Sequence, residues 1–114
     1  MVINSTQLDL TFGALADSTR RGILLQLSSG EKNVSTLVDA YQISQPAISK
    51  HLRVLEKAGL VERRKDGRQQ IVCLVTDGAE QAATWIQHYT EHWKTQFDAV
   101  EEYINAKKRE KGKS

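Results

Sequence analysis

The chain has little cysteine and little proline, and it has no long apolar run. Of its 114 residues, one is cysteine (Cys73) and one is proline (Pro46). A single thiol cannot form an internal disulfide, so a disulfide-stabilised secreted framework is excluded. No apolar stretch approaches the roughly 20 residues that span a bilayer, and the N-terminus lacks the basic and then apolar pattern of a signal peptide. A soluble, cytoplasmic protein without a membrane partner is therefore expected.

Catalytic signatures and a strong net charge are also missing. The chain contains no glycine-rich phosphate loop and no nucleophile motif, so neither an enzyme nor a cofactor is expected. The formal charge is only +2, from 16 basic and 14 acidic residues. Binding to nucleic acid would therefore depend on where the charges lie rather than on their sum. The length predicts one domain, and no internal repeat is present.

What the chain does contain is a segment, 44–60, that predicts a helix with two different faces. Ile48, Leu52 and Leu55 recur at helical spacing and form the expected core side. The other side carries polar and donor-rich groups, namely Gln45, Ser49, Lys50, His51 and Arg53. A helix that enters a DNA major groove needs such a side, because base edges are recognised by hydrogen bonds at close approach.

The ends of this helix are marked by suitable residues. Ser44 is a good N-cap, and Pro46 then falls in the first turn, where its missing N–H removes no intrahelical bond. Gly59 is placed to end the helix in the left-handed conformation. A short helix over 34–41, capped by Asn33 or Ser35, precedes it across a very short link. Two helices joined in this way predict a helix-turn-helix.

The pattern of residues 61–75 changes to that of a hairpin. Two extended runs flank Asp66-Gly67, which favours a type I′ turn with positive φ at both central residues. The hairpin carries four cations, Arg63, Arg64, Lys65 and Arg68. A cationic hairpin directly after such a helix is typical of the wing of a winged helix.

A long helix is expected from Asp77 to about Asn105, closing a single domain over 1–106, with a disordered basic tail over 107–114. Its apolar and aromatic residues recur at alternating spacings of four and three, in a pattern near a heptad. With the first helix, expected over 5–15, this stripe predicts a dimer interface. The residues assigned to that interface are Leu8, Phe12, Ile86, Tyr89, Trp93, Phe97 and Val100. The alternative is that the stripe packs onto its own domain.

These segments together resemble the ArsR family of bacterial winged-helix transcriptional repressors. The similar motifs are 14–24 (ALADSTRRGIL), 44–55 (SQPAISKHLRVL), 58–61 (AGLV) and the wing turn 66–68 (DGR). The resemblance implies a mainly α fold with a small β-hairpin, in the order α-α-α-α-β-β-α, that dimerises through its terminal helices. It also implies a homodimeric repressor of palindromic promoter DNA, with repression of its own gene as one form of that role.

The resemblance is weaker in the elements that sense a signal. Metal-sensing members carry a CxC pair on the short helix before the recognition helix, whereas 35–40 contains no cysteine. The Asp-x-His pair of a second family site is absent after Asp77. His88 and His92, at i and i+4, remain an alternative metal site, although no metal is expected. The aromatic spacing resembles a branch without an evident metal site, so the effector is unknown.

Charge is concentrated on the predicted DNA-binding segment. Residues 44–70 contain seven basic and three acidic residues, an excess of four, while the whole chain carries +2. The rest of the chain is therefore slightly acidic, which focuses positive potential on this segment. Gln45, Ser49 and Lys50 are predicted at base edges. The predicted phosphate contacts are Arg53, His51, Arg63, Arg64, Lys65 and Arg68.

Three further residues have two interpretations each. Arg20, in the first turn of the helix that Asp17 is expected to cap, is either solvated with Arg21 or bonded to a neighbouring carboxylate, or it is in contact with a phosphate. His51 is either a structural hydrogen-bonding residue or a phosphate donor. Cys73 is either a buried small apolar residue or a redox-active thiol. A winged helix used as a protein-interaction module is the alternative function from another class.

Overall fold

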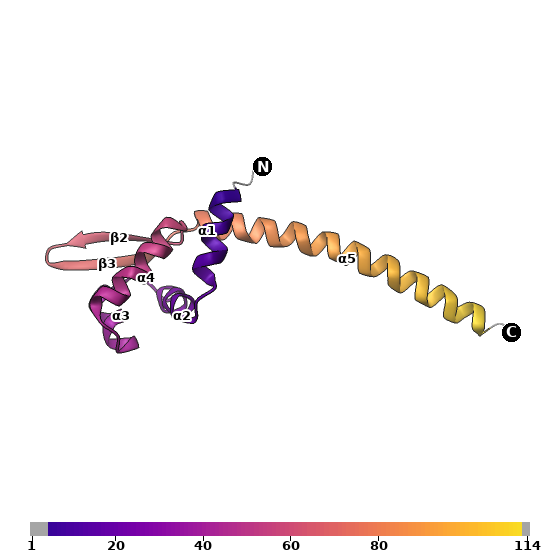
Figure 1. The fold of residues 1–114 in the computed structure, drawn as a ribbon, viewed down its shortest axis with the longest axis horizontal. Helices are drawn as coiled ribbons and strands as arrows, with labels where there is room; N and C mark the ends of the chain where they lie inside the picture. Colours follow the sequence, from indigo (N-terminus) through magenta and orange to yellow (C-terminus); the bar gives the residue numbers. More distant parts are fainter. Residues whose placement is uncertain (1–4, 113–114) are drawn as a thin grey trace. The chain divides into compact units, whose positions relative to one another are not determined.

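The computed structural model describes residues 5–112 (Figure 1). Its elements are α1 (Ser5–Leu15), α2 (Ser18–Leu27), β1 (Lys32–Asn33), α3 (Val34–Tyr41), α4 (Gln45–Lys57), β2 (Val61–Asp66), β3 (Gln69–Leu74) and α5 (Asp77–Lys111). The chain forms two compact units, Met1–Ala82 and Ala83–Ser114, and α5 begins in the first and continues through the second. No helix within the described range is long and apolar enough to cross a membrane.

The predicted N-caps are confirmed. The Asp17 side chain accepts a hydrogen bond from the backbone N–H of Arg20 at the start of α2. Asn33, rather than Ser35, caps α3, because its side chain accepts the N–H of Ser35. Ser44 caps α4 by accepting the Ala47 N–H at 3.2 Å. Each oxygen satisfies a backbone donor that has no partner within its helix.

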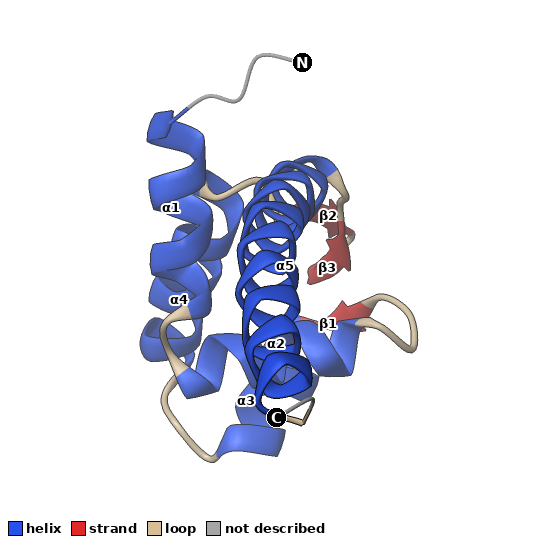
Figure 2. Ribbon diagram, turned by 90° about the vertical axis from the view of Figure 1, so that its right-hand side faces the viewer, coloured by secondary structure: helices blue, strands red, loops and turns tan. Residues whose placement is uncertain are grey.

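The sheet has one strand more than the sequence predicts. β1 pairs antiparallel with β3, and β3 pairs antiparallel with β2, giving the order β1-β3-β2 (Figure 2). The strand was missed because it has two residues and lies directly against the start of α3. It fixes the segment before α3 to the hairpin.

The turn of the hairpin is shifted by one residue from the expected position. Asp66 and Gln69 are paired across the strands, so Gly67 and Arg68 are the two central residues. Of these, Gly67 alone has a positive φ, of 63°. The prediction of a type I′ turn is therefore wrong. A glycine at the first central position with positive φ there alone fits a type II′ turn.

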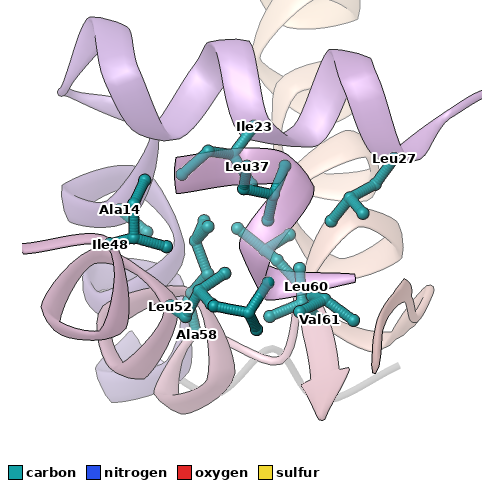
Figure 3. Packing of buried hydrophobic residues seen from close by; sticks show 12 residues of the cluster. Ala14, Ile23, Leu27, Leu37, Ile48, Leu52, Ala58, Leu60 and Val61 are labelled. Carbon is teal, nitrogen blue, oxygen red and sulfur yellow. The ribbon is translucent and has the colours of Figure 1, made fainter. Parts of the chain in front are cut away.

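The core of the first unit is formed where the helices meet the hairpin. Ile48, Leu52 and Leu55 of α4 are fully buried, as the spacing predicted. They pack with buried residues of the other elements, including Ile23, Leu27, Leu37, Leu60, Val61 and Val72. Figure 3 shows these side chains gathered from helices and strands around one centre. Because α4 contributes three fully buried residues to this core, its orientation is set by packing.

The start of α5 lies very close to the end of α4. Gly59 adopts the left-handed φ of 69° that was expected of it, and its carbonyl accepts the Gly78 N–H at 3.0 Å. A Cβ on Gly78 would lie 2.1 Å from the Ala58 carbonyl oxygen. The same carbonyl also accepts hydrogen bonds from the side chains of Gln7 and Thr11 of α1. One turn therefore joins α1, α4 and the first turn of α5.

The C-terminal helix is longer than predicted. The sequence predicts that this helix ends near Asn105 and that a disordered tail follows over 107–114. In the structure α5 extends to Lys111. Its last turn contains Lys108, Arg109 and Lys111, and cations near a helix C-terminus interact favourably with the helix dipole. The charge run that suggested disorder therefore suits a helix end. Residues 113–114 of the predicted tail lie outside the described residues, and the single-domain boundary stays a prediction.

Candidate nucleic-acid interface

Most of the polar groups singled out in the sequence lie on α4 away from its core side. Gln45, Lys50 and Arg53 are exposed, whereas Ser49 and His51 are half-buried. Lys50 and Arg53 have no ion-pair partner within residues 5–112. We call Gln45, Ser49, Lys50 and Arg53 the exposed face of α4, whereas His51 lies on the flank that contacts Arg20 of α2. The exposed face combines polar side chains that can hydrogen-bond to base edges with two cations, Lys50 and Arg53, that can contact phosphates.

The cations of the hairpin divide into two pairs. Lys65 and Arg68, at its tip, are exposed and have no ion-pair partner among the described residues. Arg63 Nε donates to Glu56 of α4 at 2.5 Å. Arg64 donates to Glu31, which lies between α2 and β1. The tip cations are thus free for an anionic partner, while those nearer the base hold carboxylates.

The Arg64–Glu31 pair is bidentate. Nη1 lies 2.7 Å from one carboxylate oxygen and Nη2 lies 2.9 Å from the other. These hydrogen bonds hold the pKa of Glu31 below its usual range and raise that of Arg64. Both side chains are about half exposed, so water screens the attraction. Contact of Arg63 or Arg64 with a phosphate stays a prediction, and it would require each guanidinium to leave or share its carboxylate.

Arg20 is bonded within the protein. Its Nε and Nη2 donate to the carbonyls of Ala14 and Gly13, at 2.8 and 3.1 Å. Its Nη1 lies 3.3 Å from Nδ1 of His51, on α4. Asp17, whose pKa is lowered chiefly by the hydrogen bond from the Arg20 backbone N–H, lies 3.9 Å from the same His51 nitrogen. This geometry favours an Arg20 side chain bonded within the protein, but its partners are carbonyls and an imidazole rather than the carboxylate expected from the sequence.

A notch between the hairpin and the helix-turn-helix adds residues that the sequence reasoning missed. It has a volume of about 300 Å³. Its lining joins Gln45 of α4 and Arg68 of the wing tip to Asn33, Val34, Ser35, Gln69 and Gln70. The N-cap pattern at Asn33 marked the start of a helix, but only the pairing of β1 with β3 brings that start beside the wing. Polar groups of four elements (β1, α3, α4 and β3) thus line one depression.

Cys73 lies in β3 and is half-buried, so it fits neither fully buried packing nor a freely exposed thiol. It lines a depression of about 340 Å³ with Glu56, Val61, Glu62, Arg63 and Arg64. Nothing in this arrangement selects between the apolar and the redox interpretation. Both remain predictions.

The part of α5 in the second unit carries a continuous aromatic run. Trp85 stacks on Tyr89 with ring centroids 5.4 Å apart, Tyr89 meets Trp93 edge-on at 5.8 Å, and Trp93 stacks on Phe97 at 5.1 Å. Ile86, Val100, Tyr103 and Ile104 are exposed on the same helix. Apolar surface of this extent on one helix is uncommon unless it meets a partner.

The other residues assigned to the dimer interface lie on α1. Leu8 is buried and Phe12 is half-buried. Their assignment, like that of the α5 residues, stays a prediction. His88 and His92 lie one turn apart on α5, and no group of three potential metal ligands occurs within residues 5–112.

Fold and site together define the class of this protein. A helix-turn-helix (α3 and α4) is followed by a hairpin whose tip cations have no ion-pair partner within residues 5–112, and a third strand joins the two. This is a winged helix-turn-helix domain. Residues 17–63 match the family model described as "Bacterial regulatory protein, arsR family".

Known transcriptional regulators are similar to this chain in sequence and in fold. The chain is 43% identical over 56 residues to the HTH-type transcriptional repressor SmtB of Mycobacterium tuberculosis, a match that covers 49% of this chain and 42% of that repressor. A solved ArsR family transcriptional regulator, RHA00566, is 32% identical with a TM-score of 0.77, covering 82% of this chain and 97% of the other. The chain belongs to the ArsR family of bacterial regulatory proteins.

A second solved relative carries a description of its assembly. It is the homodimeric winged helix-turn-helix DNA-binding domain Mb0332 of Mycobacterium bovis, solved as fragment 1–100. The identity is 30% and the TM-score 0.61, with 79% of this chain and 84% of the other covered.

Proposed function

We propose that this protein is a homodimeric transcriptional repressor that binds double-stranded DNA at palindromic promoter sites. The observation that carries the proposal is the exposed face of α4, which stands beside a wing whose tip cations, Lys65 and Arg68, have no ion-pair partner within residues 5–112. Family membership and the similarity to the SmtB repressor support it. Binding to chromosomal DNA agrees with the cytoplasmic location expected from the sequence.

The exposed face of α4 supplies sequence recognition in this proposal. Gln45 and Ser49 lie one helical turn apart near the N-terminus of α4, so both can reach neighbouring base pairs. A glutamine forms paired hydrogen bonds with adenine, and a serine hydroxyl bonds to several base edges. Lys50 extends this contact towards guanine or a phosphate. The loss of either Gln45 or Ser49 is expected to relax the preferred sequence.

In this proposal the affinity for DNA comes from the cations that have no ion-pair partner within residues 5–112. Arg53 lies on α4 and the tip cations lie on the wing, so phosphates on both sides of one groove come within reach of the same protomer. Each neutralised phosphate releases counterions, which makes the affinity fall with salt. Arg63 and Arg64 join this set only if they share or exchange their carboxylates, and Arg20 acts inside the protein.

The dimer is assigned to α1 and α5. The aromatic run Trp85–Phe97 offers large, rigid side chains, which are enriched at interfaces, and the related domain Mb0332 is described as homodimeric. A two-fold dimer that places two α4 helices about 34–36 Å apart would contact half-sites one DNA turn apart. Palindromic operators follow from this symmetry, and repression of the protein's own gene is one use of such an operator.

Selection of bound duplexes from a random library tests this proposal. The expected result is an enriched motif with two inverted half-sites whose centres lie about 10 base pairs apart. Enrichment of a single half-site would contradict the dimeric arrangement. The absence of any enrichment at low salt, together with a stable complex with another protein, would favour the interaction-module alternative.

A metal-responsive repressor is the second candidate. His88 and His92 at i and i+4 could supply two ligands, and further ligands would have to come from a second copy of the chain, since residues 5–112 hold no group of three. Titration with Zn²⁺ of the protein and of a double variant, His88→Ala with His92→Ala, separates the cases. Equal Zn²⁺ affinity in both would exclude this pair as ligands.

A further inference from the structure

The contact between Arg20 and His51 favours one tautomer of a neutral imidazole. A guanidinium has only donors, so a hydrogen bond between Arg20 Nη1 and His51 Nδ1, which lie 3.3 Å apart, requires Nδ1 to accept. A neutral imidazole that accepts at Nδ1 carries its hydrogen on Nε2. Arg20 is itself held by the Gly13 and Ala14 carbonyls, so its orientation does not depend on His51.

The second ring nitrogen is not fully buried. Nε2 of His51 makes no hydrogen bond within residues 5–112, and it is not among the buried atoms without a partner there. The side chain as a whole retains 23% of its exposure. His51 follows Lys50 on α4, but at about 100° per residue it lies on the flank of the helix that meets Arg20 of α2, beside rather than between the cations Lys50 and Arg53. The imidazole thus lies at the edge of the exposed face of α4, where a backbone phosphate rather than a base edge would be its partner.

We propose that Arg20 is a positioning residue that fixes the Nε2–H tautomer of His51, so that His51 donates this hydrogen to a DNA backbone phosphate. This inference rests on the proposed function and assigns both residues within it. Arg20 does not touch the DNA. The sequence suggested a direct contact between Arg20 and a phosphate, whereas in this proposal Arg20 acts on the phosphate only through the His51 imidazole.

Two substitutions separate this role from a purely structural one. In His51→Asn, the amide oxygen replaces the Nδ1 acceptor for Arg20, but no donor reaches the Nε2 position. In His51→Gln, the amide nitrogen replaces the Nε2 donor, but the acceptor for Arg20 is lost. A phosphate donor predicts that the Gln variant binds DNA better than the Asn variant, whereas a structural role predicts the opposite order.

The experiment measures the affinity of the full chain for a mixed-sequence duplex of about 30 base pairs, long enough for two half-sites one turn apart. His51→Asn should bind about tenfold more weakly per protomer, and His51→Gln should stay within about threefold of the wild type. Long-range ¹H–¹⁵N correlation spectra of the free protein should show the Nε2–H tautomer, and an Arg20→Met variant should show a mixture.

The outcomes test DNA binding, the phosphate contact of His51 and the positioning role of Arg20 separately. The absence of duplex binding by the wild type would overturn the proposed function and the phosphate contact with it. Binding by the wild type with the reverse order of the two His51 variants would overturn the phosphate contact alone. An Nδ1–H tautomer in the free wild type would overturn the positioning role of Arg20.

Discussion

Arg64 of β2 and Glu31 of the loop before β1 meet through two parallel hydrogen bonds, of 2.7 and 2.9 Å. This pair places a carboxylate on a wing whose other cations are proposed to approach DNA. Its stabilising effect is small, because both groups are half exposed. Its larger effect is on charge, since Glu31 occupies a guanidinium that would otherwise be available to a phosphate.

Replacing Glu31 should therefore strengthen DNA binding. In Glu31→Gln, Arg64 is released and a negative charge is removed, so the slope of log affinity against log salt should steepen by about 0.9 per protomer. Binding titrations at several salt concentrations measure this slope. Glu62→Gln is the matched control, because Glu62 is exposed on β2 and has no ion-pair partner within residues 5–112. Equal slopes for the two variants would show that Arg64 is not released to the DNA.

The cations at the tip and at the base of the wing should behave differently. Arg68→Gln should flatten the salt slope by about 0.9 per protomer and leave stability unchanged, because Arg68 has no ion-pair partner in the described range. Arg63→Gln, by contrast, should lower the free energy of unfolding, since the partly buried Glu56 then loses its ion-pair partner. Salt-dependent binding and urea unfolding together distinguish the two. A salt slope that Arg68→Gln leaves unchanged would remove the wing tip from the interface.

Stability should fall at acid pH through two identified carboxyls. The pKa of Glu31 is lowered from 4.5 by Arg64, and that of Asp17 from 3.8, first by the Arg20 backbone N–H. Since each folded-state pKa lies below its unfolded value, their contributions are complete above the unfolded pKa and are lost as the pH falls through the folded one. Urea midpoints should therefore fall as the pH is lowered below about 5.

Variants can divide this acid sensitivity between the two groups. Glu31→Gln should reduce the drop in the urea midpoint, because its side chain no longer titrates. Asp17→Asn should reduce it as well, while preserving an oxygen that caps α2. If the double variant lost stability over this range as steeply as the wild type, other carboxyls would be responsible.

Gly78 should tolerate no side chain. A Cβ there would lie 2.1 Å from the Ala58 carbonyl oxygen, and backbone atoms of Gly59 are also within 3.2 Å. Gly78→Ala should therefore destabilise the fold by about 2–4 kcal/mol, since backbone must move to relieve the clash. Gly13→Ala is the control, because nothing lies within 4 Å of its Cβ position, and alanine favours the helix by up to about 1 kcal/mol. Thermal or urea unfolding of both variants compares them directly.

The aromatic run of α5 should govern self-association. Trp93 makes ring contacts with both Tyr89 and Phe97, so Trp93→Ala should disrupt the centre of the run. The expected dimer dissociation constant rises by at least about thirtyfold, as for a central aromatic at an interface. Sedimentation equilibrium measures it, with Lys94→Ala as the neighbouring control. An unchanged constant for Trp93→Ala would place the dimer contact elsewhere.

The sequence predicted local structure well wherever one residue type has one dominant use. Ser44 and Asp17 marked helix starts through their side-chain acceptors, and both caps were confirmed. The spacing of Ile48, Leu52 and Leu55 identified the core side of α4 correctly. Each of these predictions depends on neighbours within about one helical turn, which a sequence displays directly.

The features that were missed depend on distant neighbours. β1 exists because Lys32 and Asn33 lie beside β3, some forty positions away, and two residues alone give no strand pattern. The partners of Arg64 and Arg20, Glu31 and His51, are likewise brought close only by the fold. Charge identified a basic segment, but only the structure separates the cations that hold a carboxylate from those that do not.

The separation of α4 into two faces has a consequence for how descendants of this protein can diverge. Ile48, Leu52 and Leu55 hold the helix in the core, while Gln45 and Lys50 are exposed and make no core contact. Single substitutions at the exposed positions can therefore accumulate without an unfolded intermediate. The scaffold can be inherited unchanged while the preferred operator drifts, so duplicated copies could acquire separate genes to control and retain one architecture.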